Sequence, residues 1–393
     1  MGRVRAKIID VKHIDVKLFS CRLKTKSEGK SASTSHGKPP PTPRKALMDA
    51  QIALLLVQDG VTNGAIYALM ALALVLVFAV TRIIFIPLGE FVAYGALTLA
   101  GLQSGNIPST LWLLITLTLL AIVLDIVGSV RAGKAQRIPR IVALHALIPT
   151  ACAMTVWALP PQQLALPWQV ALTLLIVVPL GPLIYRLAFQ PVADTTVLFL
   201  LIVAVAVHLV LFGLGLFFFG AEGTRTPAFT EGTIKIGEAS MQYQAIWILG
   251  TTVALIGCLA LFFERTIYGK ALRATASNRI GARLMGIPTQ MAGKLAFALA
   301  AMIGSFCGVL VSPITPIYYD TGFLVGLKGF VGAIIGALAS YPVAALGAVF
   351  VGLLESFSSF YASAFKEVIV FTVIIPVLLW RSVRTRGATE EEQ

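Results

Sequence analysis

The chain of 393 residues is 57% hydrophobic and only 12% charged. A soluble globular protein has about 25% charged residues, so this composition excludes the soluble and disordered classes and leaves a polytopic membrane protein. The formal net charge of +13 is unevenly spread. Residues 1–47 hold twelve basic and three acidic side chains, a net charge of +9, and the rest of the chain carries only +4.

The first predicted element, residues 1–47, is a disordered basic tail. It is rich in serine, contains the proline run 39–41, and has no apolar segment of the signal-peptide type. It has neither zinc-ligand spacing nor interleaved aromatic residues. Nucleic acid is therefore not an expected partner.

A series of almost charge-free segments follows, most of them close to the roughly 20 residues that a membrane-crossing helix needs. They lack the alternation of barrel strands, so they predict an all-α, polytopic helical membrane protein with about 10–11 membrane segments. The segments near 327–340 and 367–380 are short and are predicted to be re-entrant or broken helices. The predicted segments are 60–81, 86–103, 109–129, 141–159, 165–185, 196–219, 243–263, 295–316, 327–340, 343–362 and 367–380.

Basic residues in the short loops predict the orientation. The loop 264–294 carries six basic residues and one acid, and the loop 131–140 carries four basic residues and no acid. Both loops are predicted to be cytoplasmic. The loop 220–242, with three acids and two basic residues, is then external, and 381–393 is a charged cytoplasmic tail.

Counting the predicted spans back from these loops places the basic tail 1–47 outside. This position contradicts the positive-inside rule that the other loops follow. Either one span is miscounted, or the tail does not belong to the working protein. Met48 lies immediately before the first apolar run and offers an alternative start. We favour the second explanation, an over-extended N-terminus.

Catalytic signatures are missing from the sequence. It has no phosphate-binding loop, no zinc HExxH motif and no GxSxG motif, and its four cysteines have no paired spacing. We therefore expect no enzyme, no metal and no cofactor. His208, alone in an apolar span, is expected to be a packed or hydrogen-bonded residue rather than a ligand.

Three GxxxG pairs are candidates for close helix packing, because glycines four residues apart share one helix face. Two of the pairs lie in the C-terminal third, among Pro313, Pro316 and Pro342. Broken, glycine-rich helices expose backbone groups to polar substrates in transporters. The pairs are Gly60 with Gly64, Gly304 with Gly308, and Gly332 with Gly336.

Polar side chains in the apolar spans are candidates for a translocation path or for a polar network behind it. An acid inside a membrane usually faces the bundle interior or an aqueous path. Glu355 lies beside a serine cluster, Glu90 is buried or close to the interface, and Asn63 and Tyr67 are one helical turn apart. The charged residues in or near the spans are Glu90, Asp125, Lys328, Glu355, Lys366 and Glu367.

The loop 264–294 is long for a connection that only sets topology. Small and apolar residues alternate with bases along it, which predicts one or two amphipathic helices that end at Gly286. Such a cytoplasmic surface is suited to docking a partner. The alternative is a positive-inside loop without a partner.

At this loop the chain resembles the branched-chain amino acid (LIV-type) ABC transporter permeases. Residues 269–276 (GKALRATA) and 282–287 (ARLMGI) resemble the family's cytoplasmic coupling segment. Residues 326–332 (GLKGFVG) and the first span from Asp59 to Leu69 are also similar to the family. Together the matches cover most of 48–380, the transmembrane permease domain, in the same order.

The chain departs from the family at four places, one of them the last third, where the family's Gly-Gly pairs are thinned at Gly336-Ala337 and Ala339. Residues 85–88 are more apolar than the family's stretch before its Gly-Glu pair. Residues 104–163 look like an insertion without a counterpart. Residues 1–47 match nothing in the family, whose chains typically begin near the position of Met48.

The resemblance implies a multi-pass permease subunit in the bacterial inner membrane, without an ATPase site of its own. Its partners would be a second permease subunit, two cytoplasmic ATPase subunits and an external solute-binding protein. Its substrate would be a branched-chain amino acid or a related small polar solute, moved by alternating access. The resemblance places the ATPase-coupling surface at Gly269, Arg273, Ala274, Ala282 and Gly286.

Two other functions stay open at this point. A stand-alone secondary transporter or channel would need no ATPase, and a membrane scaffold would move no solute. No inverted repeat, which would favour the secondary transporter, is evident in the sequence.

Overall fold

The computed structural model describes residues 43–131, 138–158, 161–236 and 239–379. The chain divides into two compact units, Met1–Asp49 and Ala50–Gln393, and all of the packing below belongs to the second. Most of the predicted N-terminal tail and the whole C-terminal tail 381–393 lie outside the described residues. The first helix begins at Pro43, already within the segment predicted to be a disordered tail.

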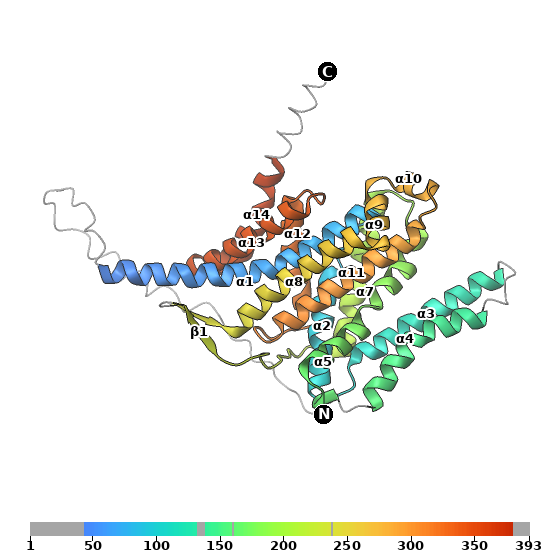
Figure 1. Cartoon of the computed structure of the whole chain (residues 1–393), viewed down its shortest axis with the longest axis horizontal. Coiled ribbons are helices and arrows are strands. Elements are labelled where there is room, and N and C mark those ends of the chain that lie inside the picture. The colour runs from blue at the N-terminus through green and yellow to red at the C-terminus, as the bar shows by residue number, and fades with distance from the viewer. Residues whose placement is uncertain (1–42, 132–137, 159–160, 237–238, 380–393) are drawn as a thin grey trace, which may run out of the picture. The chain divides into compact units, whose positions relative to one another are not determined.

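Each predicted membrane segment overlaps at least one helix, and the all-α fold class is confirmed (Figure 1). Within the described residues, seven helices are long and apolar enough to cross a membrane. The helices are α1 (Pro43–Thr81), α2 (Leu88–Gln103), α3 (Ser109–Arg131), α4 (Ile138–Ala158), α5 (Leu166–Val177), α6 (Leu180–Ile184), α7 (Val197–Phe219), α8 (Tyr243–Arg265), α9 (Ile267–Ser277), α10 (Arg279–Leu284), α11 (Thr289–Val311), α12 (Thr321–Ile335), α13 (Tyr341–Tyr361) and α14 (Lys366–Thr372).

Local sequence signals explain where several helices begin. The side chains of Thr196, Thr266 and Asn278 precede α7, α9 and α10, and each accepts a hydrogen bond from a backbone N–H of the first turn. Such caps satisfy donors that have no partner inside the helix. The prediction that the span after the coupling loop begins at 295 was wrong, because α11 already begins at Thr289.

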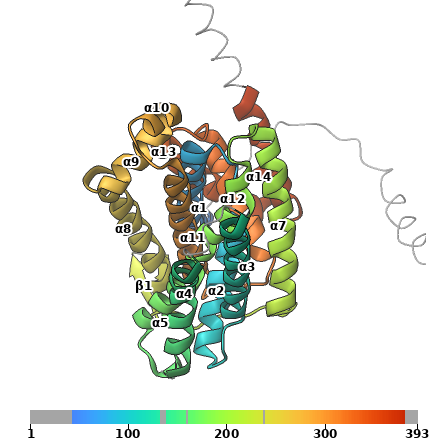
Figure 2. The ribbon, with the colours of Figure 1, turned by 90° about the vertical axis from the view of Figure 1, so that its right-hand side faces the viewer.

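The external loop predicted at 220–242 contains a small hairpin that the sequence analysis did not anticipate. Strands β1 (Thr233–Ile236) and β2 (Ala239–Gln242) pair antiparallel, with Thr233 opposite Gln242. Figure 2 shows α9 and α10 at one end of the bundle and β1 toward the other end. The helices α9 and α10 and the hairpin β1–β2 therefore belong to opposite ends of the membrane-spanning helices.

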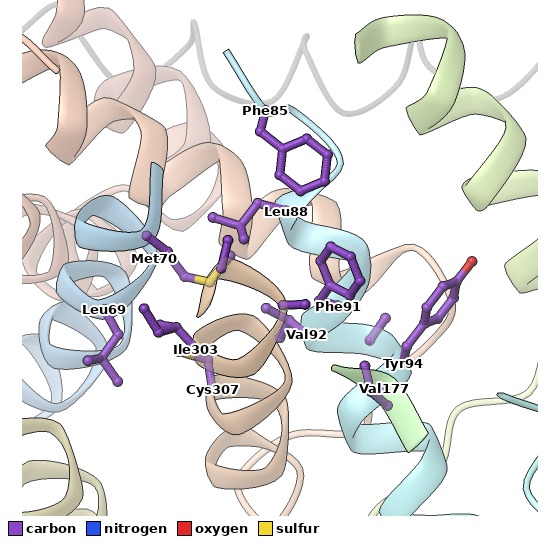
Figure 3. Packing of buried hydrophobic residues seen from close by; sticks show 14 of the residues in the cluster. Leu69, Met70, Phe85, Leu88, Phe91, Val92, Tyr94, Val177, Ile303 and Cys307 are labelled. Atoms are coloured by element: carbon purple, nitrogen blue, oxygen red, sulfur yellow. The ribbon is translucent and has the colours of Figure 1, made fainter. Parts of the chain in front are cut away.

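The short helix α2 lies at the centre of the bundle, packed against α11, α12 and α5. Nearly all of its residues are buried. Phe91 and Val92 of α2 belong to the same buried cluster as Ile303 of α11, and Figure 3 labels all three. A non-helical stretch, 82–87, separates α1 from α2, and Arg82 in it has a left-handed backbone with φ of 61°. The chain thus turns back into the bundle after α1, which leaves α2 shorter than a full span.

Candidate translocation site and coupling surface

The three GxxxG pairs lie where helices approach closely. A Cβ on Gly64 would be 2.7 Å from the Cα of Val349 in α13, and one on Gly304 would be 3.0 Å from the Cβ of Phe91 in α2. In the third pair, a Cβ on Gly332 would be 2.6 Å from the Cβ of Ala348. Their partners Gly60, Gly308 and Gly336 face the same neighbouring helices. The glycines on α1 and α12 therefore hold α13 between these two helices.

This packing brings four polar side chains from four helices into one network. The Tyr67 hydroxyl of α1 donates a 2.6 Å hydrogen bond to Glu355 of α13. The ammonium group of Lys328 in α12 lies 2.5 Å from the other oxygen of Glu355 and 3.2 Å from Glu367 of α14. The Lys328 and Glu355 side chains are only 8% and 12% exposed. Each buried charge thus has an opposite charge beside it, which offsets the cost of removing it from water.

A cavity of about 710 Å³ adjoins this network. Glu355 and Asn63 line it, with Asp59 and Lys366 as further charged groups. Hydroxyl and amide groups complete its polar part, and aliphatic and aromatic side chains form the rest of the wall. The other lining residues are Leu55, Leu56, Gln58, Thr62, Ser240, Gln242, Ala245, Ile314, Thr315, Ser356, Ser359 and Phe360. The volume and the mixture of polar and apolar groups are typical of a small-molecule site.

Glu90 does not join this cavity. It lies in the first turn of α2 and is 1% exposed. Its Oε1 is hydrogen-bonded to Nδ1 of His208 in α7, at 2.7 Å. The His208 ring stacks on Phe323 with centroids 4.4 Å apart. The structure therefore brings Asn63, Tyr67 and Glu355 together and places Glu90 in a separate pair, where His208 is packed and hydrogen-bonded as expected.

Lys328 and Glu367 were predicted only as charges in or near apolar spans, and the sequence did not assign them to the site. A lysine in an otherwise apolar helix requires a nearby counter-charge, and this requirement was the available signal. Which acid serves Lys328 depends on how α12, α13 and α14 pack, and the sequence does not give that arrangement.

The loop 264–294 forms the predicted amphipathic helices α9 and α10. Arg279 and Arg283 of α10 lie 3.6 and 3.4 Å from Asp194, which ties α10 to the segment before α7. A neighbouring face of α10, about 100° around the helix from these arginines, presents exposed apolar side chains. These are Ile280 (75% exposed), Leu284 (82%) and Met285 (84%).

The five predicted coupling residues fall into two groups. Arg273, Ala274 and Gly286 are exposed, and Gly286 has a left-handed backbone with φ of 81°. Gly269 and Ala282 are buried. A Cβ on Gly269 would be 2.7 Å from the Cα of Phe263, so this glycine permits the sharp turn from α8 into α9 rather than offering a surface.

The long apolar helices and the buried polar network among them are those of a multi-pass membrane protein. Residues 56–378 match the family described as branched-chain amino acid transport system, permease component. The chain belongs to that family, whose members are transport subunits of ABC transporters.

Curated relatives agree with this assignment. The chain is 30% identical over 223 residues to the high-affinity branched-chain amino acid transport system permease protein BraD of Pseudomonas aeruginosa, covering 54% of this chain and 72% of that protein. It is 29% identical over 219 residues to the permease protein LivH of Escherichia coli, covering 53% of this chain and 70% of LivH. No solved structure matches the chain significantly.

Proposed function

We propose that the chain is the membrane-spanning permease subunit of an ATP-driven importer that takes up branched-chain amino acids or a related small polar solute. Its partners are a second permease subunit, two cytoplasmic ATPase subunits and an external solute-binding protein. The names of BraD and LivH support the substrate class. The exposed apolar surface of α10 carries the proposal of an ATPase partner, since Ile280, Leu284 and Met285 are otherwise left in water.

The proposed orientation places α9, α10 and the C-terminus in the cytoplasm, and the hairpin β1–β2 outside. The excess of basic residues in the loop 264–294 supports this orientation. The two features lie toward opposite ends of the helices, as Figure 2 shows, which agrees with one of them facing each side of the membrane.

The packing suggests how an ATPase would drive transport. Helix α9 contacts α8 and α11, and α11 makes its most extensive contact with the central helix α2. Helix α2 in turn packs on α12, which carries Lys328. A displacement of α9 and α10 would therefore pass through packed helices to the polar network, as alternating access requires.

The solute path in this proposal includes the cavity lined by Asn63 and Glu355. An amino acid is a zwitterion, and the cavity offers both Asp59 and Lys366 as opposite charges. The aliphatic part of the wall, including Ile314, suits a branched apolar side chain. The hydrogen bond from Tyr67 and the ion pair with Lys328 fix the position of Glu355 in the wall. Glu90, which pairs with His208, is not part of the wall of this path.

Co-purification with the ATPase subunits of the same transport system tests the coupling surface. We expect the double variant I280E/L284E to lose the ATPase, because charges replace the apolar contact. The control A228E adds an acid to an exposed position in the 220–242 loop and should retain the ATPase. If I280E/L284E co-purifies with as much ATPase as the wild type does, the proposed surface is refuted.

Uptake measurements test the driving force and the path. Uptake of radiolabelled leucine should stop when ATP is depleted while the ion gradient is kept. The variant N63A should raise the KM for uptake several-fold with unchanged thermal stability, because Asn63 lines the cavity and is only half-buried. Uptake that follows the ion gradient would instead establish the secondary transporter.

A further inference from the structure

A cavity of about 480 Å³ lies where the antiparallel pair α3–α4 meets α5, α6 and the first turns of α11. Figure 1 shows this helix pair at the edge of the bundle. The walls of the cavity are mostly aliphatic, with Leu114, Leu147 and Leu183 among the residues that line it. Two basic side chains, Arg186 and Lys294, line the same cavity.

Proline explains why the helices leave this space open. Pro149 lies inside α4, Pro179 lies between α5 and α6, and Pro182 lies inside α6, and all three line the cavity. A proline ring removes a backbone donor and bends the helix, which prevents continuous close packing. The chain after α6 continues as a π-helix, Tyr185–Phe189, and Arg186 projects from this widened turn.

One of the two cations that line the cavity has no acidic partner in the part of the chain that the structure describes. Arg186 forms an ion pair with Asp125 of α3. Lys294 of α11 forms no ion pair within the described ranges of the chain. Lys294 therefore places a positive charge beside apolar walls without an ion-pair partner among the described residues. An anion in the cavity would compensate this charge and would accept hydrogen bonds from both cations.

The position of the charges along the helices specifies the kind of anion. Asp125 lies near the end of α3, and Lys294 lies near the beginning of α11. At about 1.5 Å per residue, both are within about 9 Å of their helix ends. These ends are on the same side as α9 and α10, where lipid headgroups meet the hydrocarbon.

We propose that this cavity is a binding site for an anionic phospholipid. The phosphate contacts Arg186 and Lys294, and an acyl chain occupies the space between Leu114, Leu147 and Leu183. Basic pockets between transmembrane helices are suited to anionic headgroups. The bound lipid bridges the α3–α4 pair to α6 and α11. A free phosphate ion would leave the aliphatic walls without a partner, so the site selects a lipid.

Native mass spectrometry of the full-length protein in detergent tests the proposal. The first bound lipid is counted during titration with phosphatidylglycerol or with phosphatidylcholine of the same acyl chains. We expect the wild type to prefer phosphatidylglycerol roughly thirtyfold, because each basic residue near the headgroup contributes about 1 kcal/mol. The variant R186Q/K294Q should lose this preference.

Two further variants distinguish binding at this cavity from a general effect of positive charge on the protein and from misfolding. The control R265Q/K270Q removes two exposed cations outside the cavity and should keep the preference for phosphatidylglycerol. The variant L183W fills the aliphatic part while keeping both cations, and should weaken the first binding event for both lipids. Equal affinity of the wild type for the two lipids would overturn the proposal. So would loss of the preference in the control, or displacement of the lipid by millimolar inorganic phosphate.

Discussion

At the scale of single residues, the central feature is a lysine held inside the bundle by two acids. Lys328 contacts Glu355 and Glu367, and Tyr67 donates to the remaining oxygen of Glu355. A buried ion pair contributes little net stability compared with an apolar pair, but removing one partner leaves a charge without compensation. The network therefore restricts which arrangements of α1, α12, α13 and α14 are tolerated.

The variants K328M and E355Q should differ in stability. K328M leaves the buried Glu355 without a cation, while Glu367 keeps Lys366 at 4.0 Å, and should lower the free energy of unfolding by about 3–5 kcal/mol. E355Q keeps an acceptor for Tyr67 and leaves Lys328 beside Glu367, so its cost should be smaller, about 1–2 kcal/mol. Thermal unfolding in detergent measures both. The control K366M, at a half-exposed cation, should change stability by less than about 0.5 kcal/mol. An equal loss in K328M and K366M would contradict this reading.

The pair of Glu90 and His208 gives a second prediction at this scale. H208L removes the hydrogen-bond partner of a fully buried carboxyl group and should cost about 1–3 kcal/mol. Adding E90L should recover part of that loss, because both polar groups are then gone. A double-mutant cycle on thermal stability measures the coupling. Additive losses would show that the two side chains do not interact.

At the scale of helices, small residues decide which elements touch. Gly60 and Gly64 bring α1 onto α13, so that the hydroxyl of Tyr67 reaches Glu355. The sequence predicted the spans and the shared face of each glycine pair, because both follow from apolar length and helical period. It did not predict the partner of each face, because nothing in one helix specifies which other helix approaches it.

Replacing Gly64 by alanine tests this contact. The new Cβ would be 2.7 Å from the Cα of Val349, which no side-chain rotation relieves, so α1 and α13 must separate. We expect a loss of about 1–3 kcal/mol in thermal stability, together with reduced uptake. The control G257A, at a glycine of α8 with open space around it, should instead gain about 0.5–1 kcal/mol. Similar effects of the two substitutions would contradict the close approach.

At the scale of the whole molecule, the positive-inside pattern predicts one orientation in the membrane. In a background with all four native cysteines replaced by serine, E231C should react with a membrane-impermeant maleimide in intact cells. K270C should react only after permeabilisation, because it belongs to the coupling loop. The lipid-facing variant V253C should stay unlabelled in both conditions. Labelling of K270C in intact cells would reverse the proposed orientation.

The sequence by itself determined that this protein is an all-helical membrane protein, which segments become helices, and the family to which it belongs. These conclusions rest on apolar length, loop charge and the order of short motifs, all of which are local along the chain. Only the tertiary structure decided that Glu355 takes Lys328 and Tyr67 as partners, that Glu90 pairs with His208, and that α2 occupies the centre. Such pairings join residues on different helices, between 27 and 288 positions apart, so they depend on which helices approach each other, and that is a property of the packed bundle.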